Sequence, residues 1–476
     1  MVSPLRRREF LVRSAWAAGG LLAAPRVTLG SPAARDGISR VVHVHHGRAA
    51  TWPRADGTMY RDYVDQETVF FMLDEAVRHL KGGSTEDAWR AVFPLSNPES
   101  RTLGIKVNCN NALDPADGAG NEIDAIPEPV IAVIRGFVTA GGRSANCHVY
   151  DGTNTSPQRH IATWFRDRVR AYFPDVQFHG GSGYDDYDDT RDCDPRECVT
   201  WDPAYQDPPP ETRIYGLALD WDYLVNVPVV KRHSQANITL GYKNHFGTID
   251  RCDRLHPWVY DDVPEASVLA DILGSPTVPG DPSVKSLAEK TALVVGDMLY
   301  GQPCSNFGKE PRPWDIFRGE WPNSLIVSDD PVAADSVMAD ILEQEPAYDG
   351  GCGSIRSWAR RYLEYAEAKG QGTFDHVELP VGQLFDPARM TYTKIDYRHL
   401  EMWPSGADLT KVSRLENGAI LLEWTHYFEG DLCEVWRSPN PDFSDAELLG
   451  ASPAGQYVDN HPTEPAFYRI YRSTSG

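Results

Sequence analysis

The chain has few basic residues for its acidic ones: 46 Lys and Arg against 68 Asp and Glu, for a formal net charge of -22 over 476 residues. Proteins that follow a nucleic-acid backbone present basic surfaces, so this balance argues against a nucleic-acid partner. After the N-terminal segment the sequence also lacks an apolar run of about 18 residues, the length that a bilayer requires. We therefore expect a mature protein without a transmembrane segment.

Several catalytic and cofactor-binding motifs are missing too. There is no Gly-x-Ser-x-Gly elbow, no Walker loop and no Gly-x-Gly-x-x-Gly fingerprint, which disfavours a serine hydrolase, an NTPase and a nicotinamide enzyme. No nucleotide cofactor is expected. The 8 cysteines include no CxxC pair, and the closest two, Cys193 and Cys198, favour a loop-closing disulfide over a zinc or iron–sulfur site.

The N-terminus has the features of an export signal. Arg7 and Arg8 precede Phe10, an Ala/Gly-rich segment follows, and small residues lie around Ala33. The pattern resembles a twin-arginine signal peptide over residues 1–34. It implies the twin-arginine translocase as a partner, a periplasmic or secreted location, and folding before export, often around a cofactor. A basic amphipathic start or a membrane anchor is the alternative interpretation.

Residues 35–405 alternate short β-branched runs with helical periodicity, which is typical of α/β folds. The clearest unit is a strand at 104–109, a helix with an apolar face over 130–138, and a strand at 145–150. Such a βαβ crossover predicts parallel strands. We expect an α/β domain whose mostly parallel sheet is flanked by helices.

The pattern changes in residues 406–476. Period-2 runs at 419–424, 432–437 and 466–472 alternate with turn residues, and no helical periodicity is present. This predicts a small all-β sandwich that resembles a fibronectin type III module, although it is shorter than a full one. A binding role and a packing or spacer role both remain open for it.

Polar residues at predicted strand ends are the candidate site residues, because ligands of open α/β sheets bind at the carboxyl ends of strands. Four ends carry such residues, and we expect them to converge in one cleft. They are Lys106 with Asn108, Asn110 and Asn111; Asp151 with Thr153; Lys231 with Arg232 and His233; and Asp329 with Asp330 and Asp335.

The blocks around these residues resemble a known family. They are Gly104-Ile-Lys-Val-Asn108, Ala140-Gly-Gly142, Val149-Tyr-Asp-Gly152, Leu224 to His233, Thr239 to Gly247 and Ser328 to Asp335. In this order they are similar to domain-of-unknown-function family 362. Val107 stands where that family more often has proline, and the ferredoxin-type cysteine clusters of some members are absent, which weakens an electron-transfer interpretation. The family name implies no reaction.

Two functional interpretations remain open. The first is a metal-dependent hydrolase or other proton-transfer enzyme that acts on a small or polymeric anionic substrate. Its expected residues are His233, His245, Asp151 and Asp329 as ligands of a divalent metal ion of unknown identity; His233, Lys231, Lys243, Asn244 and Lys106 in catalysis; and Asn108 and Thr153 at the substrate. The second is a non-enzymatic, extracytoplasmic ligand-binding or redox-associated protein. The same Asp and Lys side chains could also simply pair as structural groups.

Some of these residues have a simpler structural interpretation. Asp330 precedes Pro331, so we expect it to cap a helix, and Asp335 then lies where it could complement the helix dipole. His256 precedes Pro257-Trp258 and is expected to be a surface or packing histidine.

Two further patterns suggest metal binding only weakly. His43 and His45 alternate along the run that ends at His46, so they share one strand face; we expect an exposed edge strand there rather than a metal pair. The acidic run at 184–189 has oxygen ligands for calcium but lacks the EF-hand spacing, so we expect a solvated loop.

Overall fold

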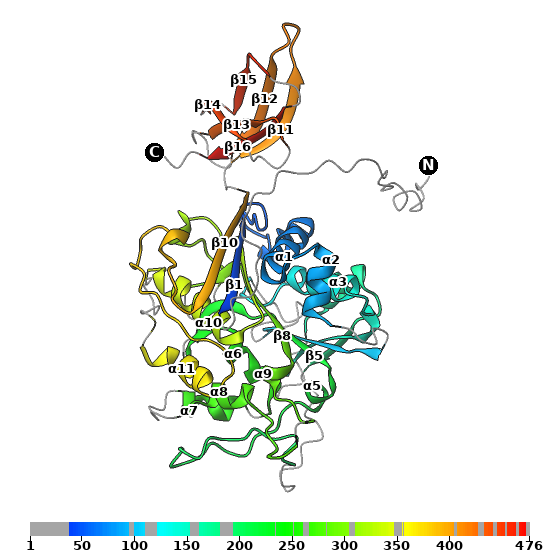
Figure 1. Cartoon of the computed structure of the whole chain (residues 1–476), viewed down its shortest axis with the longest axis vertical. Coiled ribbons are helices and arrows are strands. Elements are labelled where there is room, and N and C mark those ends of the chain that lie inside the picture. The colour runs from blue at the N-terminus through cyan, green and yellow to red at the C-terminus, as the bar shows by residue number, and fades with distance from the viewer. Residues whose placement is uncertain are drawn as a thin grey trace. The chain divides into compact units, whose positions relative to one another are not determined.

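The computed structural model describes two parts of the chain, an α/β part that ends at Trp403 and a β part that begins at Ala407 (Figure 1). The predicted signal peptide, residues 1–34, lies outside the described residues. The described residues are 38–94, 100–109, 121–152, 161–180, 194–233, 235–250, 252–259, 266–281, 283–303, 310–346, 355, 357–403, 407–426, 433–440, 445–452, 455–462 and 466–472.

A ten-stranded mixed sheet forms the centre of the described α/β part, in the order β10-β1-β9-β8-β5-β2-β3-β4, with β6 beside β8 and β7 beside β6. The strands are β1 (Ser39–His46), β2 (Leu103–Lys106), β3 (Cys147–Asp151), β4 (Gln177–Gly180), β5 (Tyr223–Asn226), β6 (Val229–His233), β7 (Asn237–Thr239), β8 (Thr291–Gln302), β9 (Ser324–Ser328) and β10 (Ile395–Trp403). Only β7 and β9 run against the others, because β9 is antiparallel to both β1 and β8 and β7 is antiparallel to β6. The predicted mostly parallel sheet is confirmed.

Helices cover both faces of this sheet. One apolar core includes residues of α1 (Gln66–Lys81), α2 (Thr85–Val92), α3 (Pro127–Thr139) and α4 (Thr163–Tyr172). A second core includes residues of α5 (Gly216–Asp220), α6 (Gly241–Asn244), α8 (Val268–Leu273), α10 (Pro331–Gln344) and α11 (Arg361–Ala368). Neighbouring residues of β5 alternate between the two cores, as the pleat of a strand requires. None of the described helices combines the length and the apolar character needed to cross a bilayer.

Short elements complete the α/β part. They are the helices α7 (His256–Val259) and α9 (Leu287–Lys290) and the 3₁₀ turns η1 (Tyr60–Asp62), η4 (Ser144–Asn146), η5 (His245–Thr248), η6 (Cys252–Leu255), η7 (Asp315–Phe317), η8 (Ser357–Arg360) and η9 (Pro387–Arg389). Of these, α7 and η5 lie next to the site described below.

The predicted βαβ unit is present, since β2 and β3 are parallel and α3 connects them. Gly141 ends that helix with a φ of 106°, a backbone conformation that glycine adopts easily. Residues 223–230 have the sequence pattern of a buried strand that contains one proline, but they do not form one continuous strand. They divide into β5 and β6 around Pro228, which has no N–H for a ladder, and Pro228 instead accepts from the Asp297 N–H at 2.8 Å.

The β part consists, as far as it is described, of two three-stranded antiparallel sheets, β11-β12-β15 and β14-β13-β16. Its strands are β11 (Ala407–Arg414), β12 (Ile420–His426), β13 (Cys433–Ser438), β14 (Glu447–Ser452), β15 (Gln456–Asp459) and β16 (Phe467–Arg472). Leu422 and Trp424 of the first sheet share a core with Val435 and Ile470 of the second. The predicted small all-β fold is confirmed, and its likeness to fibronectin type III stays a prediction.

Candidate functional site

Buried polar residues gather where β2, β3, β5 and β6 end. Because these strands are parallel to one another through β8, their carboxyl ends lie at one edge of the sheet. The turn formed by α6 and η5 adds Asn244 and His245. We call the following residues, each less than a tenth exposed, the strand-end cluster: Lys106, Asn108, Asp151, Asn226, Lys231, Lys243, Asn244 and His245.

Lys106 and Asp151 form the ion pair of the strand-end cluster. The Nζ of Lys106 lies 3.1 Å from Oδ1 of Asp151, and both side chains are at most 3% exposed. The same Nζ donates to the Val107 carbonyl at 2.5 Å, and Oδ2 of Asp151 accepts from the Cys109 N–H at 2.6 Å. The charge of Lys106 is therefore already compensated by the protein.

A chain of side-chain amides links these residues. Asn226 Nδ2 donates to the Gly241 carbonyl at 2.8 Å, and Asn244 Nδ2 donates to Asn226 Oδ1 at 2.7 Å. Asn244 Oδ1 then accepts from Lys106 Nζ at 3.1 Å and from Asn108 Nδ2 at 3.2 Å. The Gly241 carbonyl can only accept a hydrogen bond, and the Lys106 ammonium group can only donate one. These two groups at the ends of the chain therefore determine which atom of each amide is the oxygen and which is the nitrogen. Asn108 Oδ1 is buried and has no hydrogen-bond partner in the part of the chain that the structure describes.

The α6–η5 turn approaches the sheet closely at two glycines. A Cβ on Gly247 would lie 2.1 Å from Asp151 Oδ1 and 2.6 Å from Lys106 Nζ. A Cβ on Gly241 would lie 2.7 Å from Oδ1 of Asp335, whose carboxylate accepts from the N–H groups of Gly241 and Tyr242. Burial raises the pKa of Asp335 to about 7, although these donors oppose the shift. Asp335 thus positions this turn.

Lys231 is the fully buried cation of the cluster that lacks a partner. In the part of the chain that the structure describes, no atom accepts a hydrogen bond from its Nζ. Burial lowers its pKa, while the negative charges of Asp124 and Asp151 oppose that shift. A buried cation without a hydrogen-bonded counter-ion is costly.

Lys243 is buried in a different environment. Its Nζ lies 3.4 Å from the centroid of the Phe246 ring and 3.5 Å from Nε2 of His256. Burial lowers the pKa of Lys243 to about 7, and the positive charges of Lys231 and Lys106 act in the same direction. The amine can therefore gain or lose a proton near neutral pH.

Both histidines of the prediction lie here, each held by one ring nitrogen. His233 Nδ1 accepts from the N–H groups of Gln235 and Ala236, each at 3.0 Å, and burial lowers its pKa to about 2. His245 Nδ1 lies 3.0 Å from Thr248 Oγ1, and burial lowers the pKa of His245 to about 3. Its buried Nε2 has no partner among the described residues. Both rings are neutral at pH 7.

Asp329 does not lie near the strand-end cluster. The prediction that four strand ends converge in one place is therefore wrong for this strand, and the other three ends lie at one edge of the sheet. The strand β9 before it is antiparallel to β8, so Asp329 lies at the opposite edge of the sheet. There it pairs with Lys81 at 2.5 Å, and 41% of its side chain is exposed. Thr153, Asn110 and Asn111 lie outside the described residues.

The predicted metal ligands therefore do not form one site. Asp329 lies at the opposite edge of the sheet. The Nδ1 of His233 accepts a backbone hydrogen bond, and the carboxylate of Asp151 is bonded to Lys106 and to the Cys109 N–H. Within the described ranges, three potential ligand residues approach one another in a single place, which is formed by Asp340, Glu343 and His376.

That group, which we call the α10 cluster together with Arg360, already contains a cation. Arg360 Nη2 lies 3.1 Å from Asp340 and also pairs with Glu343, and its Nη1 lies 3.1 Å from His376 Nε2. His376 Nδ1 lies 2.6 Å from Asp340, whose other oxygen accepts from the Tyr392 hydroxyl. The guanidinium group takes the place that a metal ion would need.

The simpler interpretations of two residues have different outcomes. Asp330 caps α10, as predicted, and accepts from the N–H groups of Val332 and Ala333 at 2.9 Å. His256 is partly buried, and its ring stacks on His233 with 5.7 Å between centroids, in line with a packing role.

The prediction of an exposed edge strand at His43 and His45 is wrong. Residues 395–403 form β10, which covers the edge, so that β1 lies between β10 and β9. His43 is buried and bonded to the Tyr397 hydroxyl at 2.8 Å and to Ser324 Oγ at 2.9 Å. The acidic run 184–189 and Cys193 are outside the described residues, so the calcium and disulfide predictions stay predictions.

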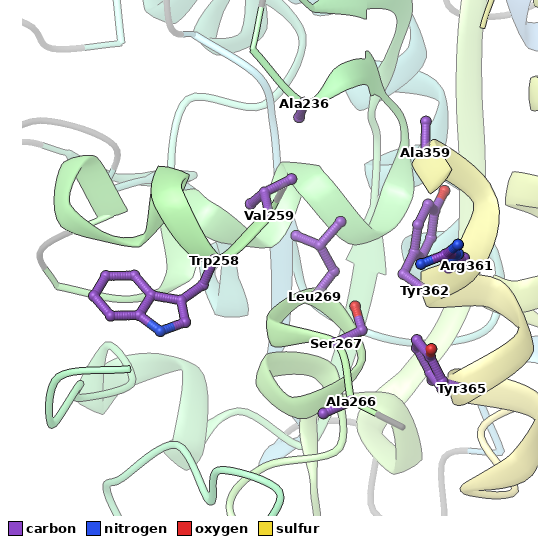
Figure 2. Close-up of a pocket in the computed structure, with 10 residues that line it drawn as sticks. All are labelled: Ala236, Trp258, Val259, Ala266, Ser267, Leu269, Ala359, Arg361, Tyr362 and Tyr365. Atoms are coloured by element: carbon purple, nitrogen blue, oxygen red, sulfur yellow. The ribbon is translucent and has the colours of Figure 1, made fainter. Parts of the chain in front are cut away.

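A pocket adjoins the cluster between α7, α8 and α11 (Figure 2). Figure 2 shows Trp258 on one side of it and Tyr362 and Tyr365 on the other. Two residues that line the pocket form hydrogen bonds with residues close to the strand-end cluster. The Ala236 N–H donates to His233, and the Tyr362 hydroxyl donates to Asp335 at 2.8 Å.

Two residues of this region were missed by the sequence analysis. Asn226 ends β5, but the run 223–230 reads as one continuous strand, which hides the polar residue inside it. Asp124 lies in the chain before α3 and is 4% exposed; no motif singles it out. A break of that strand at Pro228 is the signal that could have revealed Asn226.

Comparison with known proteins supports the resemblance of the α/β part. Residues 105–340 match the model of a family described as a domain of unknown function (DUF362). A thylakoid-associated protein of Synechocystis sp. is 29% identical over 135 residues, which are 28% of this chain and 37% of that protein. A crystal structure of a Thermotoga maritima protein has 13% identity, a TM-score of 0.29, and coverage of 65% of this chain and 59% of that one, values too low to support an argument. The chain thus spans less than two thirds of both, and its residues 105–340 are similar to domain-of-unknown-function family 362.

Proposed function

We propose that the strand-end cluster binds an anionic substrate, and that the protein carries out proton-transfer chemistry on it, such as hydrolysis. The observation that carries this proposal is the Nζ of Lys231, which is fully buried and has no partner among the described residues. A bound anion would supply the missing counter-charge and hydrogen bond. Lys106 differs, because Asp151 already compensates it.

Lys243 is the group best suited to move a proton. Its pKa of about 7 means that both the amine and the ammonium form are populated at neutral pH, the condition that general acid–base catalysis favours. In this scheme Lys231 holds the anion, Lys243 exchanges the proton, and Asn244 keeps Lys106 and Asn108 in place.

The proposed chemistry uses side chains of the protein itself. The residues present do not fit the divalent metal site expected from the sequence, since the ligands at Asp329 and His233 are directed elsewhere. A small and a polymeric substrate remain equally compatible with the proposal.

Calorimetric titration with inorganic phosphate, sulfate, acetate and chloride tests the proposed anion site. We expect at least one of the multivalent anions to bind the wild-type protein and to lose at least tenfold in affinity in Lys231→Met, as a charge-assisted hydrogen bond would. Lys394→Met is the matched control, because Lys394 pairs with Glu367 at the surface. Equal affinity in wild type and Lys231→Met, or no binding of any of the anions, would contradict the proposal.

A non-enzymatic binding protein is the second candidate, favoured by the neutral, backbone-held state of His233. Assays with chromogenic phosphate, sulfate and carboxylate esters separate the two. An enzyme should turn over one class and lose that turnover, but not phosphate affinity, in Lys243→Met. A binding protein should show no turnover with any of them.

We also propose that the chain is exported through the twin-arginine pathway to the periplasm or beyond. The support is the paired Arg7 and Arg8 before an apolar, alanine-rich segment. Replacing both by Lys should leave the precursor in the cytoplasm, which cell fractionation measures, because this pathway distinguishes guanidinium from ammonium groups. Normal export of the double variant would contradict the proposed twin-arginine signal.

A further inference from the structure

A second cavity, of about 610 Å³, lies at the amino ends of three neighbouring parallel strands. Its lining includes Arg101, Tyr223 and Lys290, which stand at or within two residues of the first residue of β2, β5 and β8. We call it the amino-end cavity. It lies at the edge of the sheet opposite the strand-end cluster, and its volume is in the range of pockets that bind small organic molecules.

Cationic side chains outnumber carboxylates in the lining of the amino-end cavity. The whole chain has the opposite balance, with 46 basic against 68 acidic residues. A concave surface lined mainly by one sign of charge attracts ligands of the other sign. The cationic residues are Arg101, Arg196, Lys285 and Lys290, and the acidic ones are Asp220 and Asp222.

The two arginines of the cavity are already compensated by the protein. Arg101 pairs with Asp222, whose other carboxylate oxygen accepts from the Thr102 N–H at 2.9 Å. Arg196 Nη2 lies 2.8 Å from Asp281. Neither guanidinium group therefore requires a ligand.

The two lysines differ from the arginines. Lys285 is exposed, and among the described residues it has neither a hydrogen bond nor an ion pair. Lys290 donates to the Leu219 carbonyl, a neutral acceptor, and no described carboxylate forms an ion pair with it. Burial lowers the pKa of Lys290, and the positive charge of Lys285 acts in the same direction, while Asp220 and Asp222 oppose the shift.

The same lining has an apolar part. Leu219, Tyr223 and Val284 contribute to it, and each is partly buried. The Tyr223 hydroxyl donates to the Pro94 carbonyl at 3.1 Å, so its polar end already has a partner. Such a combination suits a ligand that has an apolar body as well as a charge.

We propose that the amino-end cavity binds an organic carboxylate with an apolar ring or chain. Its carboxylate pairs with the ammonium groups of Lys285 and Lys290, which line the same cavity, and its apolar body packs on Tyr223 and Val284. This is a second ligand site, which goes beyond the proposed function and does not depend on it.

Benzoate, benzamide and benzamidine test the proposal, because they have nearly the same shape and are negative, neutral and positive at neutral pH. Calorimetry on the full chain measures their affinities. We expect benzoate to bind at least about tenfold more tightly than benzamide, and benzamidine to bind most weakly. Equal affinities of benzoate and benzamide, a preference for benzamidine, or no binding of any of the three would overturn the inference.

Variants of the two lysines locate the site. The double variant Lys285→Met/Lys290→Met should lose at least about tenfold in benzoate affinity, and Lys285→Arg/Lys290→Arg should stay within about threefold of the wild type. Lys394→Met is the surface control and should bind benzoate as the wild type does. Undiminished affinity in the folded Met double variant would overturn the proposal. If that variant fails to fold by circular dichroism, the exposed Lys285→Met alone decides, with an expected loss of at least about threefold.

Lys231→Met separates this inference from the proposed function. Benzoate should bind this variant within about threefold of the wild type, since the two sites lie at opposite edges of the sheet. A loss of benzoate affinity in Lys231→Met, with none in the variants of Lys285 and Lys290, would assign benzoate to the strand-end cluster and overturn the inference. If multivalent anions fail to bind while benzoate binding requires Lys285, the proposed anion site is overturned and the inference stands.

Discussion

The strand-end cluster and the α10 cluster are both rich in charge and built around buried residues, yet they differ in what they leave unpaired. In the α10 cluster Asp340 is buried, Glu343 is half-buried and His376 is exposed. In the α10 cluster, the carboxylate of Asp340 and both nitrogens of His376 have partners within the protein. The Nε of Arg360 has none among the described residues, but the charge of its guanidinium group is paired with Asp340 and Glu343. In the strand-end cluster, the described residues supply no hydrogen-bond partner to Lys231 Nζ, His245 Nε2 or Asn108 Oδ1.

This difference teaches that a gathering of ligand-type residues does not by itself indicate a site. The spacing of a metal centre is present at Asp340, Glu343 and His376. However, Arg360 pairs with the two carboxylates, so the group forms an internal ion-pair network. The stronger signal for function is a buried ammonium group for which the described residues supply neither a counter-ion nor a hydrogen-bond acceptor, because such a group is costly unless a ligand completes it.

The largest expected effect is at the closed α10 cluster. Asp340→Ala should lower the free energy of unfolding by about 3–5 kcal/mol, because it removes the buried carboxylate that pairs with the buried guanidinium group of Arg360. Urea unfolding measures this loss, and phosphate affinity of the folded variant should stay at the wild-type level. A loss below about 1 kcal/mol would show that the cluster is not a structural network.

Lys231→Met should have the opposite effect on stability. Removing a buried cation that has no counter-ion should leave the free energy of unfolding unchanged or raise it by about 1–4 kcal/mol in the absence of anions. Urea unfolding in a buffer free of multivalent anions measures it. A clear destabilisation would mean that Lys231 has a structural partner, and the contrast between the clusters would disappear.

The pH dependence of stability tests the state of Lys243. Its folded pKa of about 7 lies below the ordinary value of 10.5, so the unfolded chain binds more protons between these two pH values. Lys243 therefore makes the stability of the wild-type protein rise with pH across that window. Lys243→Met should show a smaller rise than the wild type in unfolding experiments from pH 7 to 10; parallel curves would contradict the lowered pKa.

The smallest effect is expected at Asp329. Its pair with Lys81 is partly exposed, so Asp329→Ala should cost less than about 1 kcal/mol in unfolding free energy. Phosphate affinity should not change, because Asp329 lies at the opposite edge of the sheet from the strand-end cluster. A strong loss of phosphate affinity would restore Asp329 to the site and overturn the comparison.

The sequence was sufficient to predict the parallel strands and the residues at their ends. Lys106, Asp151 and Lys231 follow buried strands, and the βαβ pattern implies that these strands share a direction. Strand direction was not predictable for β9, because the hydrophobic pattern of a strand is the same in either direction. The neighbouring β8 was not recognised, and its antiparallel pairing places Asp329 at the other edge.

The sequence could not predict which polar atoms of the strand-end cluster have hydrogen-bond partners, for a different reason. Whether Asn108 Oδ1 is bonded depends on a hydrogen-bond chain that joins Asn108 to Asn244, 136 positions away, and then to Asn226. The burial of His43 depends likewise on β10, which comes more than 350 positions later in the chain. Such contacts follow from tertiary packing, which local periodicity does not encode.

The most direct test of the central claim is a crystal structure of the protein soaked with arsenate, whose arsenic atom is located by its anomalous scattering. The account predicts arsenate at the edge of the sheet where β2, β3, β5 and β6 end, within hydrogen-bond distance of Lys231 Nζ. A structure in which Lys231 Nζ is bonded to a group of the protein, with arsenate absent from this edge of the sheet, would contradict it.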